Sequence, residues 1–248
     1  EIFHVLKRIL ERITGDPSFY RSPTEMGVNC AGFAITDDDV TKEASKQELI
    51  RRYFRYRCEY AMGFADAETV QRAELFLKDF HLEPKDRRVV LPAHDAARDA
   101  QNRDKGNEGI FCGAAIELKD GTIITGSNSS LMHAASSMII HAIKYLAGIP
   151  EKIKLLPPHI TNAVGNLKTN ILHERSVSLD LEEALIALSV SAINNTAAQL
   201  AMEKLKDLKS CEVHITHIPT SGDEAGLRRL GVNLTSDPNF STKDLFMP

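Results

Sequence analysis

The spacing of the apolar residues changes near residue 106, and this change constrains the fold more than any other feature. Over the first hundred residues, apolar side chains recur every three to four positions, which is typical of amphipathic helices. One such stripe consists of Leu49, Tyr53, Tyr56, Tyr60 and Phe64. After residue 106, short apolar runs of strand length alternate with helical stretches. We therefore predict an α+β protein with a helical domain over 1–105 and a layered α/β domain over 106–248.

The boundary between the two domains is expected in a polar stretch over 95–107. This stretch has many charged and amide side chains and few apolar ones, which favours a linker over a regular element. The 248 residues of the chain suffice for two modest domains, each with a core of its own.

The second half begins with a hairpin signal. Asp120-Gly121, a dipeptide favoured in tight turns, stands between an apolar run over 110–118 and a return strand over 122–125. A helix over 131–147 follows and ends at Gly148. The remaining expected elements are a strand over 153–156, helices over 180–193 and 197–208, a strand over 212–218, a helix over 223–230 and a strand over 232–235.

Composition and charge exclude several classes of protein. The formal net charge is -4, so general nucleic-acid binding through phosphate neutralisation is not expected. No window of 18 apolar residues exists, so we expect no membrane partner. The four cysteines are far apart in sequence, which removes CxxC zinc and redox motifs, and no signal peptide is visible. These features favour a cytoplasmic protein with reduced thiols.

The hairpin and the helix after it resemble the start of a cytidine-deaminase-like domain. The resemblance rests on the segments AAIE (114–117), DGT (120–122) and TG (125–126). Zinc deaminases carry His-x-Glu at the start of this helix and a Pro-Cys-x-x-Cys motif on the next helix. Here the helix has His133-Ala134-Ala135, and no cysteine pair follows. We therefore predict the architecture without its zinc motif, with no zinc and no other metal site.

Five polar residues are candidates for ligand contacts, namely Asn29, Arg52, Asn128, Ser129 and His214. Asn128 and Ser129 precede a helix, where backbone N–H groups can bind an anion, although the two side chains equally suit a helix cap. Arg52 lies in a basic and aromatic segment, which a salt bridge to Glu48 also explains. His214 lies near the end of a strand, where ligands often bind in α/β sheets, but a core histidine fits the same pattern.

Two further polar features have a structural and a functional interpretation. Asn194-Asn195-Thr196 interrupts an apolar helix, either as a kink with a new cap or as a break that faces a ligand. His133, Ser137, His141 and Lys144 share one helix face, which we interpret as a solvated face rather than a groove.

Four longer phrases together resemble one family. They are YRSPTEMGVN (20–29), which contains Asn29, EASKQELIRRY (43–53), DGTIITG (120–126) and LGVNLT (230–235). They are similar, in order and over nearly the whole chain, to the uncharacterised bacterial family catalogued as domain of unknown function 1846. The resemblance implies that this chain, which starts at Glu1, is the C-terminal half of a longer protein. The other half would be Rossmann-like, with a glycine-rich loop that resembles a phosphate-binding loop.

The resemblance leads to two hypotheses on function. In the first, the five candidate residues contribute to a nucleotide or phosphate site formed with the missing N-terminal half. The cofactor stays unassigned, and a nucleotide bound through that half is the candidate. In the second, the chain is a structural or oligomerisation module without catalytic activity, and its apolar helices support a homo-oligomer. The family has no established reaction, so the resemblance assigns no catalytic residue.

Overall fold

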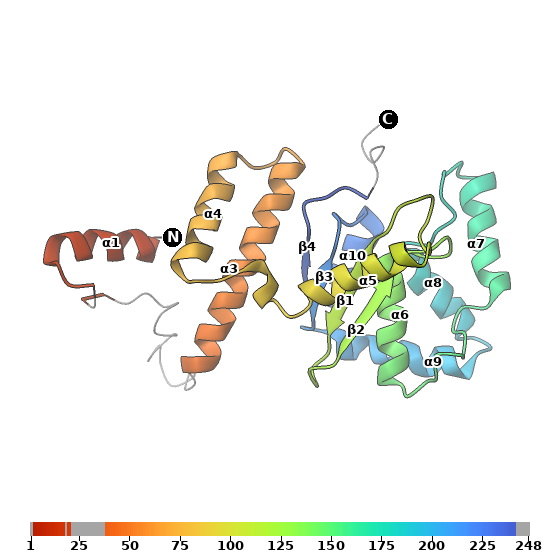
Figure 1. The fold of residues 1–248 in the computed structure, drawn as a ribbon. Coiled ribbons are helices and arrows are strands. Elements are labelled where there is room, and N and C mark those ends of the chain that lie inside the picture. The colour runs from red at the N-terminus through yellow and green to blue at the C-terminus, as the bar shows by residue number, and fades with distance from the viewer. Residues whose placement is uncertain (1, 18, 21–37, 242–248) are drawn as a thin grey trace. The chain divides into compact units, whose positions relative to one another are not determined.

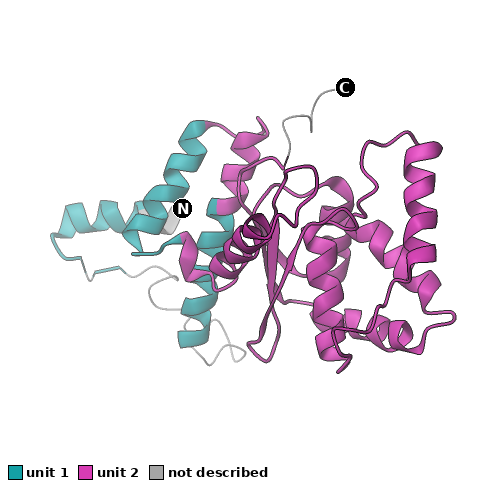
Figure 2. Cartoon of the chain, turned by 45° about the vertical axis from the view of Figure 1, so that its right-hand side comes forward, with its two compact units in different colours: residues 1–53, 67–83 teal, residues 54–66, 84–248 magenta. Residues whose placement is uncertain are grey.

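The computed structural model describes residues 2–17, 19–20 and 38–241, and this part of the chain is an α+β protein (Figure 1). It divides into two compact units (Figure 2). Unit 1 comprises residues 1–53 and 67–83, and unit 2 comprises residues 54–66 and 84–248. Over the described residues, no helix has both the length and the apolar character that a membrane span requires.

Unit 1 is built from helices. A hydrogen bond from Arg8 Nη2 to Asp79 Oδ2 (3.0 Å) joins α1 (Ile2–Thr14) to α4 (Ala67–Asp79). The long helix α3 (Asp38–Ala61) begins in unit 1 and continues into unit 2. Within α3, Arg52 Nε lies 3.4 Å from Glu48 Oε1, which confirms the predicted ion pair between these side chains.

The predicted apolar stripe of α3 is wrong in its position on the helix. Ile50, Phe54 and Cys58 are buried at a spacing of four residues, and Tyr53 is buried beside them. Tyr60 is 52% exposed. The pattern was misleading because apolar and aromatic residues stand on adjacent faces of α3, and the spacing alone does not tell which face is packed.

Unit 2 contains a mixed sheet with the strand order β2-β1-β3-β4. The strands are β1 (Gly113–Glu117), β2 (Ile123–Ser127), β3 (Glu212–Ile215) and β4 (Asn233–Ser236). β1 pairs antiparallel with β2 and with β3, whereas β3 and β4 are parallel. The hairpin prediction is confirmed, and its turn has Gly121 at a φ of 83°. The predicted strand over 153–156 is wrong, because this segment forms turns after Pro150.

Unit 2 also contains the helices α5 (Val90–Asn102), α6 (Ala134–Leu146), α7 (Pro158–Asn170), α8 (Leu181–Ser191), α9 (Thr196–Glu203) and α10 (Ser221–Leu230), with 3-10 turns at Pro84–Asp86 and Lys204–Leu208. Four of these helices, which are α6, α8, α9 and α10, follow the predicted order with shifted bounds, whereas α5 and α7 were not predicted. The break between α8 and α9 is a helix cap, because Asn195 Oδ1 accepts from the N–H groups of Ala197 and Ala198.

The two faces of the sheet are covered by different helices. Ala114 and Ile116 of β1 belong to the large core with α6, whereas Ala115 packs with Val89 and Ala93 on the side of α5. Two glycines make these approaches possible. A Cβ on Gly113 would lie 2.1 Å from the carbonyl oxygen of Ala93, and one on Gly126 would lie 2.2 Å from a backbone nitrogen of α6.

The predicted linker over 95–107 is wrong for most of its length, because residues 90–102 form α5. The charged residues pair along the exposed side of the helix, as in the contacts of Arg98 with Asp95 (3.2 Å) and of Arg103 with Asp99 (3.0 Å). Small alanines face the sheet, so the helix lacks the large apolar residues that reveal a buried stripe. As a border between separately folding domains, residue 105 stays a prediction.

Replacing Gly113 by Ala tests the close approach of α5 to the sheet. We expect Gly113→Ala to lower the free energy of unfolding by about 1–3 kcal/mol, because the new methyl group overlaps a backbone carbonyl. Gly165→Ala in α7 is the matched control, since its Cβ would meet Val177 at an ordinary 3.6 Å. The free energy of unfolding of the control should rise by about 0.5–1 kcal/mol, because alanine favours a helix more than glycine does. Urea unfolding of both variants measures the difference, and equal stability would contradict the packing argument.

Candidate functional site

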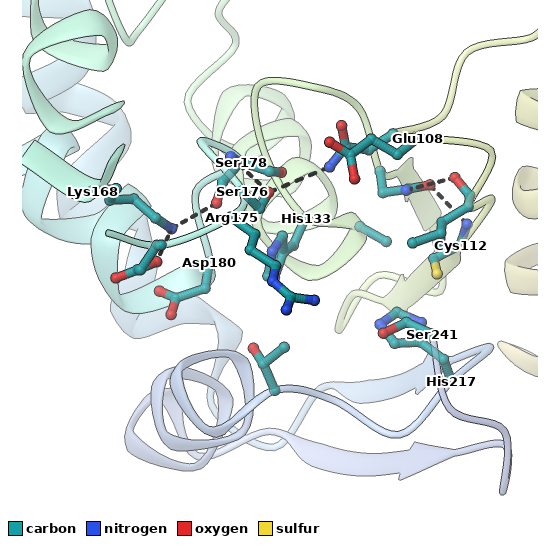
Figure 3. A pocket seen from close by; sticks show the side chains of 16 residues that line it. Glu108, Cys112, His133, Lys168, Arg175, Ser176, Ser178, Asp180, His217 and Ser241 are labelled. Atoms are coloured by element: carbon teal, nitrogen blue, oxygen red, sulfur yellow. Dashed lines mark hydrogen bonds and ion pairs between the residues drawn. The ribbon is translucent and has the colours of Figure 1, made fainter. Parts of the chain in front are cut away.

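A cavity of about 760 Å³ lies in unit 2 where three helices begin. The N-cap residues of α6, α8 and α10, which are His133, Asp180 and Thr220, all line it. Its other walls include Asn107, Glu108, Cys112, Asn128, Lys168, Arg175 and His217. In the view of Figure 3, Lys168 and Asp180 lie on one side, Cys112 and His217 lie on the other, and His133 lies between them. The cavity has the size of a small-molecule site.

The carboxylate of Asp223 connects the three helix starts. Asp223 is 1% exposed, and its Oδ2 accepts hydrogen bonds from Thr220 Oγ1 (2.9 Å) and His133 Nδ1 (2.8 Å). Its Oδ1 accepts from the backbone N–H of Leu181, the first residue of α8 (2.9 Å). A carboxylate accepts hydrogen bonds, so His133 carries a proton on Nδ1, and Nε2 is the nitrogen that remains for proton exchange.

The environment of His133 favours its charged form. Burial works against a positive charge on the ring, but the hydrogen bond to Asp223 and the charge of Asp223 outweigh it and raise the pKa of His133. A histidine whose Nδ1–H is held by a buried carboxylate has a fixed tautomer and a fixed ring orientation. The pair is therefore arranged as a general acid–base group at the wall of the cavity.

The side of the cavity at Lys168 and Asp180 carries a network of charges. Asp180 and Glu183 form a capping box at the start of α8, and Lys168 Nζ donates to Glu183 Oε2 (2.7 Å) and to the carbonyl of Ser178 (2.9 Å). A Cβ on Gly222 would lie 2.0 Å from Asp180 Oδ2, so a larger residue there would displace the carboxylate that caps α8. The carboxylates offset the charge of Lys168, which suits a polar ligand better than a strongly anionic one.

His217 and Cys112 differ in what they offer a ligand. His217 is 6% exposed, and its Nδ1 has no hydrogen-bond partner among the described residues. Burial lowers the pKa of His217 to about 4, so the ring is neutral at pH 7. Burial raises the pKa of the Cys112 thiol to about 12, which removes it as a nucleophile.

Of the predicted site residues, Asn128 is the one that lines the cavity. Its Oδ1 accepts from the backbone N–H of Cys112 (2.7 Å), and its Nδ2 donates to the carbonyl of Ile110 (2.9 Å). Ser129 Oγ accepts from the N–H of Met132 (3.3 Å) in a turn before α6. The predicted helix cap by Asn128 or Ser129 is wrong, because the N-cap of α6 is His133. These contacts account for both side chains, and a ligand contact by either stays a prediction.

Of the other three candidates, neither Arg52 nor His214 lines the cavity. Arg52 belongs to unit 1, and Asn29 falls outside the described residues. His214 is fully buried in β3 beside His94 and Asp237, and it does not line the cavity. That these five residues form one site therefore stays a prediction.

The acid–base pair was missed because its two residues are distant in sequence. The stripe pattern predicts a solvated His133, whereas its side chain is 24% exposed, and Lys144 of the same stripe is buried, at 4% exposure. Thr220 and Asp223 have the spacing of a helix cap, and Thr220 Oγ1 indeed accepts from the N–H of Asp223. A histidine directly before one helix and an acid in the first turn of another were the available signals.

Replacing His217 tests the cost of keeping this ring neutral. Because its pKa falls from 6.5 to about 4 on folding, its contribution to stability is complete above pH 6.5 and is lost as the pH falls towards 4. The loss should be on the order of 3 kcal/mol. We expect His217→Gln to flatten the dependence of unfolding free energy on pH in this window, measured by urea titrations.

Two comparisons keep this test specific. His159→Gln alters an exposed ring of α7 and should leave the pH dependence as it is. Burial also lowers the pKa of His214, so part of the acid sensitivity remains in His217→Gln. A curve for His217→Gln that coincides with that of His159→Gln would contradict the assignment.

Comparison with known proteins identifies the relatives of the chain. Two family models match, "Domain of unknown function DUF1846, N-terminal" over residues 1–81 and "Domain of unknown function DUF1846, C-terminal" over residues 85–246. A "UPF0371 protein" of Clostridium botulinum (strain Alaska E43 / Type E3) is 49% identical over 246 residues. A "UPF0371 protein" of Clostridium tetani is 44% identical over 246 residues. Each match covers 99% of this chain and 49% of the relative, so the chain spans about half the length of these curated relatives.

The family matches correct one sequence-based prediction and confirm another. Because the N-terminal family model matches residues 1–81, the interpretation of this chain as the C-terminal half alone is wrong. The two predictions that depend on it are also wrong, namely a site shared with a missing N-terminal half and that half as the partner of this chain. The resemblance itself is confirmed, and the chain belongs to the bacterial DUF1846 (UPF0371) family.

Proposed function

We propose that unit 2 binds a small polar molecule in the cavity and that His133 exchanges a proton with it. The observation that carries the proposal is the hydrogen bond between His133 Nδ1 and the buried carboxylate of Asp223 (2.8 Å) at the cavity wall. A carboxylate buried at 1% exposure is costly unless it is fully hydrogen-bonded, and here its partners hold an imidazole ring in place.

The proton would move between the ligand and Nε2 of His133. Asp223 holds the proton on Nδ1, so the neutral ring presents a lone pair on Nε2. When Nε2 takes a proton from an O–H or N–H group of the ligand, the carboxylate stabilises the resulting imidazolium. The hydrogen bond to Asp223 and its charge outweigh burial and raise the pKa of His133, so the site favours the protonated ring that forms in this step.

The start of α6 provides a place for the negative charge that the ligand gains. α6 begins without a side-chain cap hydrogen bond among the described residues, and its first residue, Ala134, lines the cavity. The N–H groups of a helix start carry partial positive charge, which stabilises a developing anion. With the Cys112 thiol protonated, the arrangement supports proton transfer rather than thiol chemistry.

A cytidine-deaminase-like topology of unit 2 belongs to the same proposal. The hairpin β1-β2, the helix α6 packed on it and the insertion of β3 beside β1 support it. The cavity lies at the start of α6, where zinc deaminases place their His-x-Glu motif. Here His133 has an acid partner from α10 instead, so the site would work without the zinc motif. A cytoplasmic location is also proposed, supported by the free thiols of the described cysteines, which are Cys58, Cys112 and Cys211.

His133→Gln tests the proposal directly. The probes are amino acids, small amides, hydroxy acids and monosaccharides, added singly to the 248-residue chain while its melting temperature is recorded. We expect at least one of these classes to raise the melting temperature of the wild type. The dissociation constant of that compound should rise about tenfold in His133→Gln, because one hydrogen bond is lost.

His159→Gln is the matched control, because it removes an imidazole from the exposed surface of the same unit. It should bind the compound as the wild type does. If no probe class stabilises the wild type, or if His133→Gln and His159→Gln bind equally well, the proposal is wrong.

A further inference from the structure

A second cluster of chemically reactive side chains lies on the other face of the sheet. It consists of His94 from α5, His214 from β3 and Asp237, which follows β4. One ligand atom from each residue lies within 4.8 Å of the others. Val213 and Ile215 point into the core with α6, so His214 between them faces the side of α5. The cluster shares no residue with the cavity.

The hydrogen bonds around Thr235 determine which nitrogen of His214 carries a proton. Thr235 Oγ1 accepts from Arg87 Nε (2.9 Å) and donates its single hydrogen to the carbonyl of Val213 (3.1 Å). Its remaining contact, to His214 Nδ1 at 2.9 Å, is therefore one in which the ring donates. A neutral His214 then has its lone pair on Nε2.

The lone pair of His214 faces a carboxylate. Nε2 is buried without a hydrogen-bond partner among the described residues, and it lies 3.5 Å from Asp237 Oδ1. Two electron-rich atoms in this position repel each other unless a positive charge lies between them. Two ligands of one tetrahedral zinc ion are about 3.4 Å apart, since each bond is about 2.1 Å long.

We propose that His94 Nε2, His214 Nε2 and the Asp237 carboxylate bind one divalent transition-metal ion, for which Zn²⁺ is the first probe. Two imidazoles and one carboxylate suit zinc or iron, whereas Mg²⁺ and Ca²⁺ prefer oxygen ligands. His94 Nε2 now lies 2.7 Å from Asp237 Oδ2, so the ion replaces the hydrogen between these atoms. The side chain of His94 is 39% exposed, which gives it room to adjust.

The surroundings are those of a metal site with a supporting shell. Arg87, which is 1% exposed, also donates to the carbonyls of Val213 (3.0 Å) and Asn233 (2.6 Å), so the hydroxyl that orients His214 is itself held in place. The ring of Phe54 packs on His214, with 4.8 Å between the centroids. Three protein ligands leave an open position, and the exposed edge at His94 would give water or a substrate access to it.

Zinc titration of the whole chain tests the site. The 248-residue protein is freed of metal with a chelator and titrated with ZnCl₂ in a calorimeter. We expect one Zn²⁺ per chain and at least a tenfold rise in the dissociation constant for His94→Ala and for Asp237→Asn. His159→Ala removes an exposed histidine, and His133→Gln alters the cavity, so both should bind zinc as the wild type does.

A ligand exchange separates coordination from a mere effect on folding. His94→Cys replaces an imidazole by a thiolate, so Co²⁺ bound there should show a sulfur-to-metal charge-transfer band that the wild type lacks. The proposal is overturned if the wild type binds no more zinc than His94→Ala, or if His133→Gln abolishes binding. It is also overturned if Co²⁺ bound to His94→Cys gives no such band.

Discussion

The hydrogen bonds of the Asp223 carboxylate are the interaction on which the cavity depends. One buried side chain accepts from the start of α8, from the cap of α10 and from the histidine that precedes α6. Burying a carboxylate is unfavourable, and these donors offset the cost only while all three helix starts stay together. The same geometry that stabilises the core of unit 2 therefore also orients His133. Structure and proposed chemistry share one set of atoms.

Close packing of helices on both faces of the sheet explains why unit 2 can carry two separate candidate sites. Gly126 allows α6 to approach one face, and Gly113 allows α5 to approach the other. Strand alternation then sends neighbouring residues to opposite faces, so that Val213 and Ile215 enter the core with α6, whereas His214 meets α5. The cavity uses the loops and helix starts at the end of the strands. The His94 cluster uses the opposite face and the residue after β4.

Local signals in the sequence predicted local structure well. The dipeptide Asp120-Gly121 identified the hairpin, and Asn195 identified the break between α8 and α9, because both depend on neighbouring residues only. The helix α5 was interpreted as a linker, since its core contacts are made by alanines, which carry a weak apolar signal. The predicted stripe of α3 was wrong for a non-local reason, because Phe54 packs on His214 and Cys58 contacts Ser236, which are far away in sequence.

Such local signals do not identify the candidate sites, because the residues of each site are far apart in sequence. His133 and Asp223 are 90 residues apart, and His94 and Asp237 are 143 apart, so no spacing rule connects them. Thr235 illustrates what this means for the family. Its hydroxyl has one hydrogen to give, and the choice of acceptor decides which nitrogen of His214 is protonated. An exchange of this threonine for valine would keep the strand and its shape. Without the hydroxyl, however, nothing would select which nitrogen of His214 carries the proton. Relatives with the same fold and the same histidine could therefore differ in chemistry.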